Sequence, residues 1–299
     1  CGTEVDFVDI TLNTGLIDPE ILREKLEDAK RKNRLPKIIV VVHLAGTSCE
    51  MKTIREITQN YGIKIIEDAS HAIGGSYMGS PVGNCKYSDI TIFSFHPVKI
   101  ITTGEGGLAT TRNQEYAESM RLLRSHGIEK DKDKFVGVEK DGWKYEQQYL
   151  GMNYRMTDIQ AALGLSQAKR LSRIIEERNS IYNHYRKEFA RRGLPVKIME
   201  IPSNVKSALH LCVIQLKDKE ETIHRDLFSY LRNNGIGVQL HYSPIHLQPY
   251  YRKMGFRKGD VPNSEMYEKI SISIPIYPGL KKEEQNRVID IISCFFGIK

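Results

Sequence analysis

The sequence predicts an α/β fold: a mostly parallel sheet in a large first domain, followed by a smaller C-terminal α/β domain. A strand, a helix and a strand follow one another between residues 37 and 67, which is the order of a βαβ unit. The strand at 37–43 contains Ile-Ile-Val-Val-Val, a β-branched run expected of a strand buried on both faces. After Leu209 shorter strands and helices alternate. We therefore divide the 299 residues into domains 1–165 and 166–299.

Local signals mark the elements of the first domain. Asp18, followed by a proline, opens a helix that runs to about Asn33. Thr47 and Glu50 have the spacing of a capping box at the start of a helix that stops at Gly62. The remaining expected elements are strands at 3–10, 37–43, 63–67, 90–95 and 107–111 and a helix at 113–124.

A long helix is expected to carry the chain into the second domain. Thr157 and Gln160 form a second capping box, and the helix after them is expected to run to about Arg192, where Gly193 ends it. The expected elements beyond this helix are strands at 210–216, 237–241 and 271–275 and helices at 220–233, 263–269 and 282–295. Their alternation predicts the smaller α/β domain.

Polar residues with the chemistry of a cofactor site follow two of the strands. Asp68 comes directly after the strand at 63–67, and Ser94 and Lys99 lie at and just beyond the end of the strand at 90–95. Open α/β sheets bind ligands at the carboxyl ends of their strands. A lysine can form a Schiff base with an aldehyde, and a carboxylate can keep a pyridine nitrogen protonated. This set predicts a site for pyridoxal 5′-phosphate (PLP).

In this interpretation Lys99 is the Schiff-base lysine and, once substrate displaces it, serves as general base and then general acid. Asp68 faces the ring nitrogen, and Ser94 donates its hydroxyl to the cofactor phosphate. The plain alternatives are a loop lysine, a helix cap or turn former, and a turn cap, respectively. Glu67 is interpreted as a structural neighbour. The Thr102–Gly107 turn lacks the order of a nucleotide-binding loop and is interpreted as glycine flexibility near the lysine.

Six separated motifs resemble those of one enzyme family. They are Asp68-Ala-Ser-His71, Ser94-Phe-His-Pro-Val-Lys99, Thr103-Gly-Glu-Gly-Gly107, Arg124-Ser-His-Gly127, Asn153-Tyr-Arg-Met-Thr-Asp-Ile-Gln160 and His241-Tyr-Ser-Pro-Ile-His246. In this order they resemble the DegT/DnrJ/EryC1/StrS sugar aminotransferases over nearly the whole chain, which implies a fold-type-I PLP-dependent enzyme. The likeness to the family's pseudaminic acid branch implies amino transfer from L-glutamate to the 4-keto group of a UDP-linked 4-keto-6-deoxy-N-acetylhexosamine.

The resemblance also implies roles for residues outside the cofactor-binding strands. His71 would contact the phenolic oxygen of the cofactor ring, with an ordinary interior histidine as the alternative. Asn153 would reach across a homodimer interface to the partner's cofactor phosphate, with Arg155 nearby, so that the two subunits share each active site. The alternative for both is a polar loop. The last motif would lie on the substrate side, or else at the surface, with His241, Tyr242 and His246.

Two segments carry expectations of their own. Residues 127–150 are polar, charged and without period, and they are longer than an ordinary connection. They are expected either to cover a sugar substrate or to form a disordered surface loop. The family places a phosphate-binding Gly-Thr/Ser turn and a stacking aromatic residue before the first strand. Since the sequence starts at Cys1 and its Gly2-Thr3 pair precedes a different strand, we expect an N-terminal truncation that affects cofactor affinity.

Three alternatives to the pseudaminic acid assignment stay open at this point. The same chemistry could act on another nucleotide-linked keto sugar, either a 4-keto pentose or a 3-keto hexose. A dehydratase of the same family would use the same cofactor, but such enzymes carry a histidine where this sequence has Lys99. The third alternative is a non-catalytic regulator or an inactive fragment.

Composition limits the remaining classes of function. The net charge is +7 and the pI about 9.0, which suits an anionic nucleotide-sugar. No basic run interleaved with aromatic residues is present, so no nucleic-acid partner is expected. The five cysteines form no Cys-x-x-Cys pair, which predicts reduced thiols in the cytoplasm and no metal site. No apolar run reaches the ~18 residues of a membrane span, and no signal peptide is expected.

Overall fold

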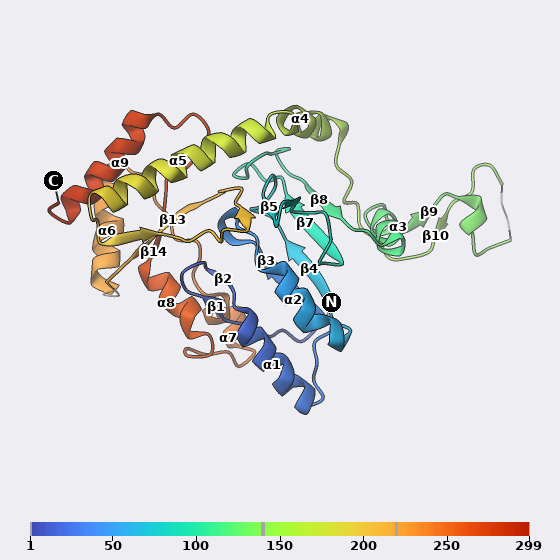
Figure 1. Cartoon of the computed structure of the whole chain (residues 1–299). Coiled ribbons are helices and arrows are strands. Elements are labelled where there is room, and N and C mark those ends of the chain that lie inside the picture. Colours follow the sequence, from blue (N-terminus) through green and yellow to red (C-terminus); the bar gives the residue numbers. More distant parts are fainter. Residues whose placement is uncertain (1, 139–140, 219–220, 299) are drawn as a thin grey trace.

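Two sheets organise the computed structural model, which describes residues 2–138, 141–218 and 221–298 (Figure 1). The first sheet has the strand order β3-β4-β7-β8. Its strands are β3 (Ile38–Val42), β4 (Lys64–Asp68), β7 (Ile90–Ser94) and β8 (Gly107–Thr110). The first three run parallel and β8 is antiparallel to β7. The mostly parallel sheet predicted from the βαβ pattern is confirmed.

Two helices cover one face of this sheet. α1 (Pro19–Arg31) and α2 (Met51–Thr58) pack their apolar side chains against Ile39, Val41 and Ile65. On the opposite face Ile38, Val40 and Val42 are 52%, 54% and 46% exposed. The prediction that both faces of this strand are buried is wrong, because alternate strand residues point to opposite faces and the described helices cover one of them.

The starts of these two helices differ from each other. The Asp18 carboxylate accepts hydrogen bonds from the first turn of α1, so the predicted cap is confirmed. At α2 the capping box is wrong although the helix is present, because Glu50 makes no capping bond and Thr47 donates to Ser207 Oγ at 2.9 Å. The Glu50 carboxylate instead accepts from the Tyr77 hydroxyl. The side chains of Thr47 and Glu50 therefore bond to residues outside α2.

The N-terminal segment is not the strand expected at 3–10. Only β1 (Ile10–Thr11) is a strand here, and it forms a short antiparallel pair with β2 (Leu16–Ile17). Asp9 is buried, and its carboxylate accepts from Asn263 N at 2.7 Å and Ser264 N at 2.9 Å. It thereby caps the start of α8 (Pro262–Ile270), so the segment is bonded to that helix and is not paired in the first sheet.

The long helix predicted after Thr157 is divided. Its capping box is confirmed at the start of α4 (Asp158–Ala168), but the helix changes direction at Arg170, and α5 (Leu171–Arg191) follows. α4 is fixed to the turn after Lys99, because Gln167 Oε1 accepts from Thr102 N and Gln160 Nε2 donates to Glu105 O. α5 packs into the C-terminal core. α4 therefore contacts the turn after Lys99, and α5 contacts the C-terminal core.

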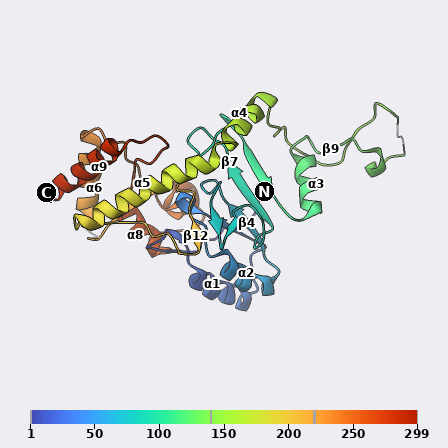
Figure 2. The same ribbon diagram turned by 45° about the horizontal axis from the view of Figure 1, so that its top comes forward.

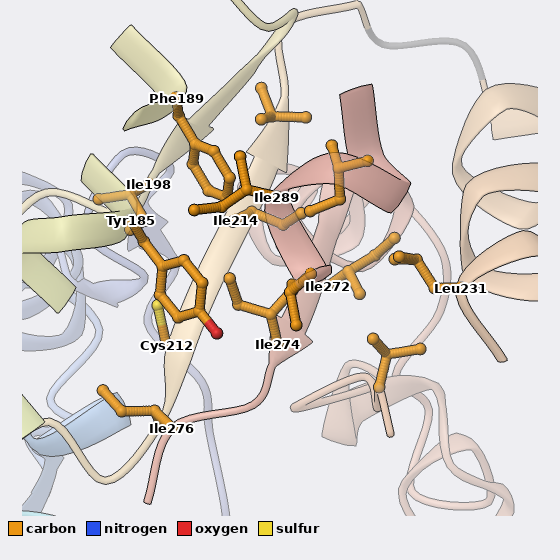
Figure 3. Packing of buried hydrophobic residues seen from close by; sticks show 14 of the residues in the cluster. Tyr185, Phe189, Ile198, Cys212, Ile214, Leu231, Ile272, Ile274, Ile276 and Ile289 are labelled. Carbon is orange, nitrogen blue, oxygen red and sulfur yellow. The ribbon is translucent and has the colours of Figure 1, made fainter. Parts of the chain in front are cut away.

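The second sheet belongs to the C-terminal part. It has the antiparallel order β11-β13-β14, with β11 (Val196–Ile198), β13 (Cys212–Leu216) and β14 (Ser271–Ile274). Around it lie α5, α6 (Glu221–Asn233), α8 and α9 (Lys282–Phe295). Figure 3 shows Tyr185 and Phe189 of α5 against the strands and Ile289 of α9.

The sequence predicts the helices of this part better than its strands. The expected helix at 282–295 is confirmed, and of the one at 220–233 only residue 220 lies outside the described residues. The strand expected at 237–241 is wrong, because pairing there is limited to a bridge between Gln239 and Ser273. The boundary at residues 165 and 166 stays a prediction.

The segment 127–150 projects from the main body as an arm (Figures 1 and 2). It follows α3 (Gln114–Leu123) and is held at its base by the pairing of β9 (Ile128–Glu129) with β10 (Glu146–Gln147). Residues 139–140 lie outside the described residues. The strand pair at the base differs from the expectation of a disordered loop. The other expectation, that this segment covers a sugar substrate, stays a prediction.

The remaining elements are short. They are β5 (Ser76–Tyr77), β6 (Ser80–Pro81) and β12 (Val205–Lys206) in a small sheet, helix α7 (Pro249–Arg252), and 3₁₀ turns at 44–46, 59–61, 132–134 and 245–247. Within the described ranges no helix has the length and apolar character needed to cross a membrane. Cys49, Cys85, Cys212 and Cys294 are unpaired, and Cys1 lies outside the described residues.

Candidate active site

The site is built at the carboxyl ends of β4 and β7, where the sequence predicts it. Asp68 is the last residue of β4 and pairs in register with Ile92 of β7. Ser94 is two residues further along β7, so it lies on the same face of the sheet as Asp68. This is the face that α1 and α2 leave open.

Asp68 is held firmly in place. Its Oδ1 accepts hydrogen bonds from Ser70 N at 3.0 Å and from Ser70 Oγ at 2.5 Å. Its carbonyl accepts from His43 N at 3.0 Å, and Ala69 N donates to Ile92 O at 2.9 Å. In the hydrogen bonds of the described residues Oδ2 has no donor, so this oxygen can accept one from a bound ligand.

Lys99 lies in the turn that follows β7. Its backbone N–H donates to His96 O at 3.0 Å, and Ile100 and Ile101 after it are buried. The lysine side chain is partly buried, which lowers its pKa, while the charge of Asp68 acts in the opposite direction. A lysine with a lowered pKa is more often neutral, as a nucleophile or a general base must be.

Three of the predicted ligand-binding residues meet near this lysine. Burial and then the charge of Lys99 lower the pKa of His71 to about 4, and the same causes lower the pKa of His241. The Tyr242 ring lies 6.3 Å from the His71 ring in a stacked arrangement. Burial, followed by the charge of Asp68, raises the pKa of Tyr242. The structure therefore brings together residues from distant parts of the sequence.

Sequence reasoning missed one residue of this group, His210. Its ring centroid lies 4.4 Å from that of His71, and the side chain is 8% exposed. It comes just before the apolar run of β13, and the sequence predicts it as the first residue of that strand. A lone polar side chain entering an apolar run was the available signal.

His246 has a different environment from the other residues of its motif. It is 2% exposed, and its Nε2 lies 3.0 Å from Glu265 Oε1. The ring also faces Phe7 at a centroid distance of 6.3 Å. Contact between His246 and substrate stays a prediction, and the structure gives this side chain a buried partner of its own.

Asn153 and Arg155 lie at the arm, apart from the group around Lys99. Asn153 forms a bridge with Ser125, just after α3, and both Asn153 and Arg155 are exposed. Arg155 borders a groove together with Arg121 and His126. Within one chain these residues are not part of the Lys99 cluster, so their cofactor role stays a prediction that requires a second subunit.

Glu67 anchors the buried side of β4. Its carboxylate receives His43 Nε2 at 2.7 Å and Thr91 Oγ1 at 2.9 Å, and the Ser88 hydroxyl also donates to it. Burial raises the pKa of Glu67, but the bonds from His43, Ser88 and Thr91 outweigh it and lower the pKa overall. Glu67 is thus a buried charged residue that fixes β4 next to Asp68.

The DegT/DnrJ/EryC1/StrS aminotransferase family model matches residues 1–293. The chain belongs to this family. Family members are PLP-dependent sugar aminotransferases, and this chain is one of them. The predicted family, fold type and cofactor are thereby confirmed.

Characterised and uncharacterised relatives cover almost the same part of the chain. A UDP-4-amino-4,6-dideoxy-N-acetyl-beta-L-altrosamine transaminase of Campylobacter jejuni is 37% identical over 97% of this chain and 73% of its own length. The protein MJ1066 of Methanocaldococcus jannaschii is 39% identical over 96% and 72%, respectively. Spore coat polysaccharide biosynthesis protein SpsC of Bacillus subtilis is 35% identical over 97% and 73%.

Solved structures agree with the sequence relatives. Helicobacter pylori PseC, an aminotransferase involved in the biosynthesis of pseudoaminic acid, superimposes with a TM-score of 0.86 at 29% identity. The alignment covers 98% of this chain and 73% of PseC. The PLP form of Spr1654 from Streptococcus pneumoniae gives a TM-score of 0.85 at 26% identity, over 98% of this chain and 75% of that one.

The side chains of this DegT-family chain fit the family's cofactor. Lys99 supplies a partly buried amine, and Asp68 keeps one carboxylate oxygen without a donor among the described residues. The buried Nδ1 atoms of His71 and His210 lack a hydrogen-bond partner within the described part of the chain. Such atoms are costly unless a ligand or water satisfies them. No group of three or more His, Cys, Asp or Glu side chains in that part could hold a metal ion.

Proposed function

We propose that this aminotransferase moves the amino group of L-glutamate to the 4-keto group of a UDP-linked 4-keto-6-deoxy-N-acetylhexosamine. The likeness to the C. jejuni transaminase, at 37% identity over 97% of this chain, carries the proposal. The structural likeness to PseC supports the same class of sugar. Unpaired cysteines in the described residues support a cytoplasmic location.

The residues around Lys99 supply the chemistry. When bound, PLP supplies a ring that accepts the electron pair left behind as a carbon loses its proton. Asp68, fixed through Ser70, would keep the ring nitrogen protonated, and Ser94 would donate its hydroxyl to the phosphate. The Lys99 amine would bind the aldehyde and then carry the proton, first as base and then as acid. Its lowered pKa favours the neutral form that starts this transfer.

We further propose that the enzyme works as a homodimer in which Asn153 completes the partner's site. The arm, the segment between it and α4, and α4 itself expose large apolar side chains, which monomeric proteins seldom gather in one region. The most exposed are Val136, Val138, Trp143, Leu150, Tyr154 and Ile159. A second copy of the chain would cover them and bring Asn153 to a cofactor that Lys99 of the other subunit holds.

Absorbance spectroscopy tests the reaction in two stages. PLP added to the protein should give a visible band that L-glutamate bleaches, and the Lys99→Ala variant should give neither the band nor turnover. Retained turnover in that variant would contradict the assignment of Lys99. A panel of nucleotide-linked keto sugars, including a 4-keto pentose and a 3-keto hexose, then tests the substrate. Faster turnover of another sugar would overturn the proposed one.

A further inference from the structure

Two buried histidines next to Lys99 have nitrogen atoms without partners. His71 and His210 are 7% and 8% exposed, and their rings are 4.4 Å apart at an angle of 39°. Among the described residues neither Nδ1 has a hydrogen-bond partner. A single orphaned nitrogen can be a packing defect. Two on adjacent rings, both near Lys99, indicate buried positions that a ligand or a water molecule would satisfy.

The backbone around His210 is fixed tightly. The buried Arg178 side chain donates through Nη1 to the carbonyls of Leu209, His210 and Ile276 at 2.9, 3.2 and 3.1 Å. A guanidinium that binds three carbonyls cannot move without losing them. These bonds fix α5, the segment before β13 and the segment after β14 relative to the backbone of His210.

Gly46 brings His71 to the same place. Its φ is +96°, and a Cβ there would lie 2.7 Å from His71 O and 2.8 Å from Leu209 N. The absence of a side chain therefore lets the segments that carry the two histidines approach each other. The pairing is built by three separate parts of the chain rather than by one loop.

Both imidazoles are neutral near pH 7. Burial is the main cause, and it lowers the pKa of His71 to about 4 and that of His210 to about 2, with the charge of Lys99 contributing to both. A neutral imidazole has one donor and one acceptor nitrogen. It suits an uncharged oxygen better than a phosphate or a carboxylate, which a cation would bind more strongly.

We propose that His210 is a ligand-binding residue of this site, and that its Nδ1, next to that of His71, binds a hydroxyl oxygen of the cofactor or the sugar. The inference deepens the proposed function and rests on it. Two sources offer this chemistry: the phenolic hydroxyl of the cofactor ring and a hydroxyl of the sugar. They are distinguished by which dissociation constant depends on His210.

Binding measurements on the full chain test the proposal. The cofactor arm compares PLP with 3-deoxypyridoxal 5′-phosphate, which lacks the phenolic oxygen. If the phenolic oxygen is the ligand, His210→Ala should weaken PLP binding at least about tenfold and change the affinity of the deoxy analogue less. If a sugar hydroxyl is the ligand, PLP affinity should be unchanged and the dissociation constant of UDP-N-acetylglucosamine should rise by a similar factor.

Two further substitutions separate binding from folding. The asparagine amide can place a polar atom near the position of imidazole Nδ1 and glutamine near Nε2, so His210→Asn should restore affinity better than His210→Gln. A structural role would not favour one over the other in this way. His224→Gln is the matched control, because His224 is also buried but its Nε2 bonds Ser271 O at 2.9 Å.

Unchanged affinity of His210→Ala for both ligands would overturn the proposal, and so would equal rescue by asparagine and glutamine. These ratios compare variants with the wild type and do not involve glutamate or turnover. The bleaching of the cofactor band by glutamate tests the proposed function separately, so either can fail without the other.

Discussion

In the proposed function, Asp68 is the residue whose charge acts most directly in the chemistry. Its Oδ1 accepts hydrogen bonds from Ser70 N and Ser70 Oγ, and the Oδ1 atom of an asparagine can accept the same two bonds. Asp68→Asn should therefore preserve the fold but remove the partner of a protonated ring nitrogen. Because a hydrogen bond to a charged group is worth about 1.5–3 kcal/mol, kcat should fall at least about tenfold. Steady-state kinetics measure this, and near-normal kcat with unchanged circular dichroism would contradict the assigned role.

The two neutral histidines make stability depend on pH. In the folded protein their pKa values are about 4 for His71 and about 2 for His210, below the ordinary value of 6.5. The unfolded chain therefore binds more protons as pH falls below 6.5, and the free energy of unfolding falls with it. Each histidine contributes about 1.4 kcal/mol per pH unit between its two pKa values.

Urea unfolding of His210→Asn between pH 6.5 and 4 measures this contribution. The variant should lose stability less steeply than the wild type, because asparagine does not titrate. Carboxylates contribute equally to both proteins and cancel in the comparison. Parallel curves for the two proteins would show that His210 is not held neutral by its surroundings.

The buried pair of His43 and Glu67 gives a third prediction at the residue scale. His43→Ala removes the partner at 2.7 Å and leaves a buried carboxylate short of one donor. Leaving a buried acceptor without its donor costs about 1–3 kcal/mol of unfolding free energy. Adding Glu67→Gln should recover part of this loss, since the unpaired charge is then gone. His184→Ala is the control, because His184 bonds the neutral side chain of Asn286 at 2.8 Å.

Chemical denaturation of the three variants and the wild type decides the outcome. If the double variant is less stable than His43→Ala alone, the loss comes from the cavity and not from the charge. If His43→Ala lowers the free energy of unfolding no more than His184→Ala does, the pair of His43 and Glu67 does not stabilise the strand that carries Asp68.

At the scale of elements, the base of the arm depends on two glycines. A Cβ at Gly151 would lie 2.2 Å from Gly127 N and 2.6 Å from His126 C, and both of these are backbone atoms. Gly151→Ala should force the two chains of the base apart, at a cost of about 1–3 kcal/mol. Limited proteolysis within 127–150 should become faster. Gly142→Ala is the matched control, because nothing lies within 4 Å of its Cβ position.

The elements also show what could be predicted from sequence. The helix at 282–295 and the strands at 63–67 and 90–95 were predicted to within one residue, because local apolar pattern specifies them. The capping role of Thr47, the strand at 3–10 and the unbroken helix after Thr157 were wrong. Their outcomes depend on Ser207, on the start of α8 and on the turn at Thr102, which are distant in sequence.

The same distinction applies to the site. Asp68, Ser94 and Lys99 follow strands that the sequence marks clearly, so their placement at one sheet edge could be predicted. His210 could not, because its proximity to His71 depends on Arg178, Gly46 and the packing of the C-terminal part. No spacing in the sequence relates residue 71 to residue 210.

At the scale of the whole molecule, the open face of the first sheet coincides with the site. Ile38, Val40 and Val42 are exposed on the face where Asp68 and Ser94 also lie. Covering apolar strand residues on an open face lowers the free energy of the protein. Under the proposed function, a group that covers this face would also lie next to Asp68 and Ser94.

The proposal that two subunits share each active site yields the last prediction. Asn153 lies at the arm and Lys99 in the turn after β7, so each cofactor would need Lys99 from one subunit and Asn153 from the other. Lys99→Ala and Asn153→Ala should each be nearly inactive. Mixed dimers of the two variants contain one site with both native residues. Random pairing makes about half of all dimers mixed, so activity should recover to about a quarter of the wild-type value.

Co-expression of the two variants with different affinity tags tests this complementation. Purification through both tags isolates the mixed dimer, whose activity should be about half that of the wild type because one of its two sites is intact. The pair Lys99→Ala and Asp68→Asn is the control, since both residues come from the same subunit's sheet and no arrangement restores a native site. Activity no greater than this control would place Asn153 outside the partner's site, and a monomer in sedimentation velocity would exclude a shared site altogether.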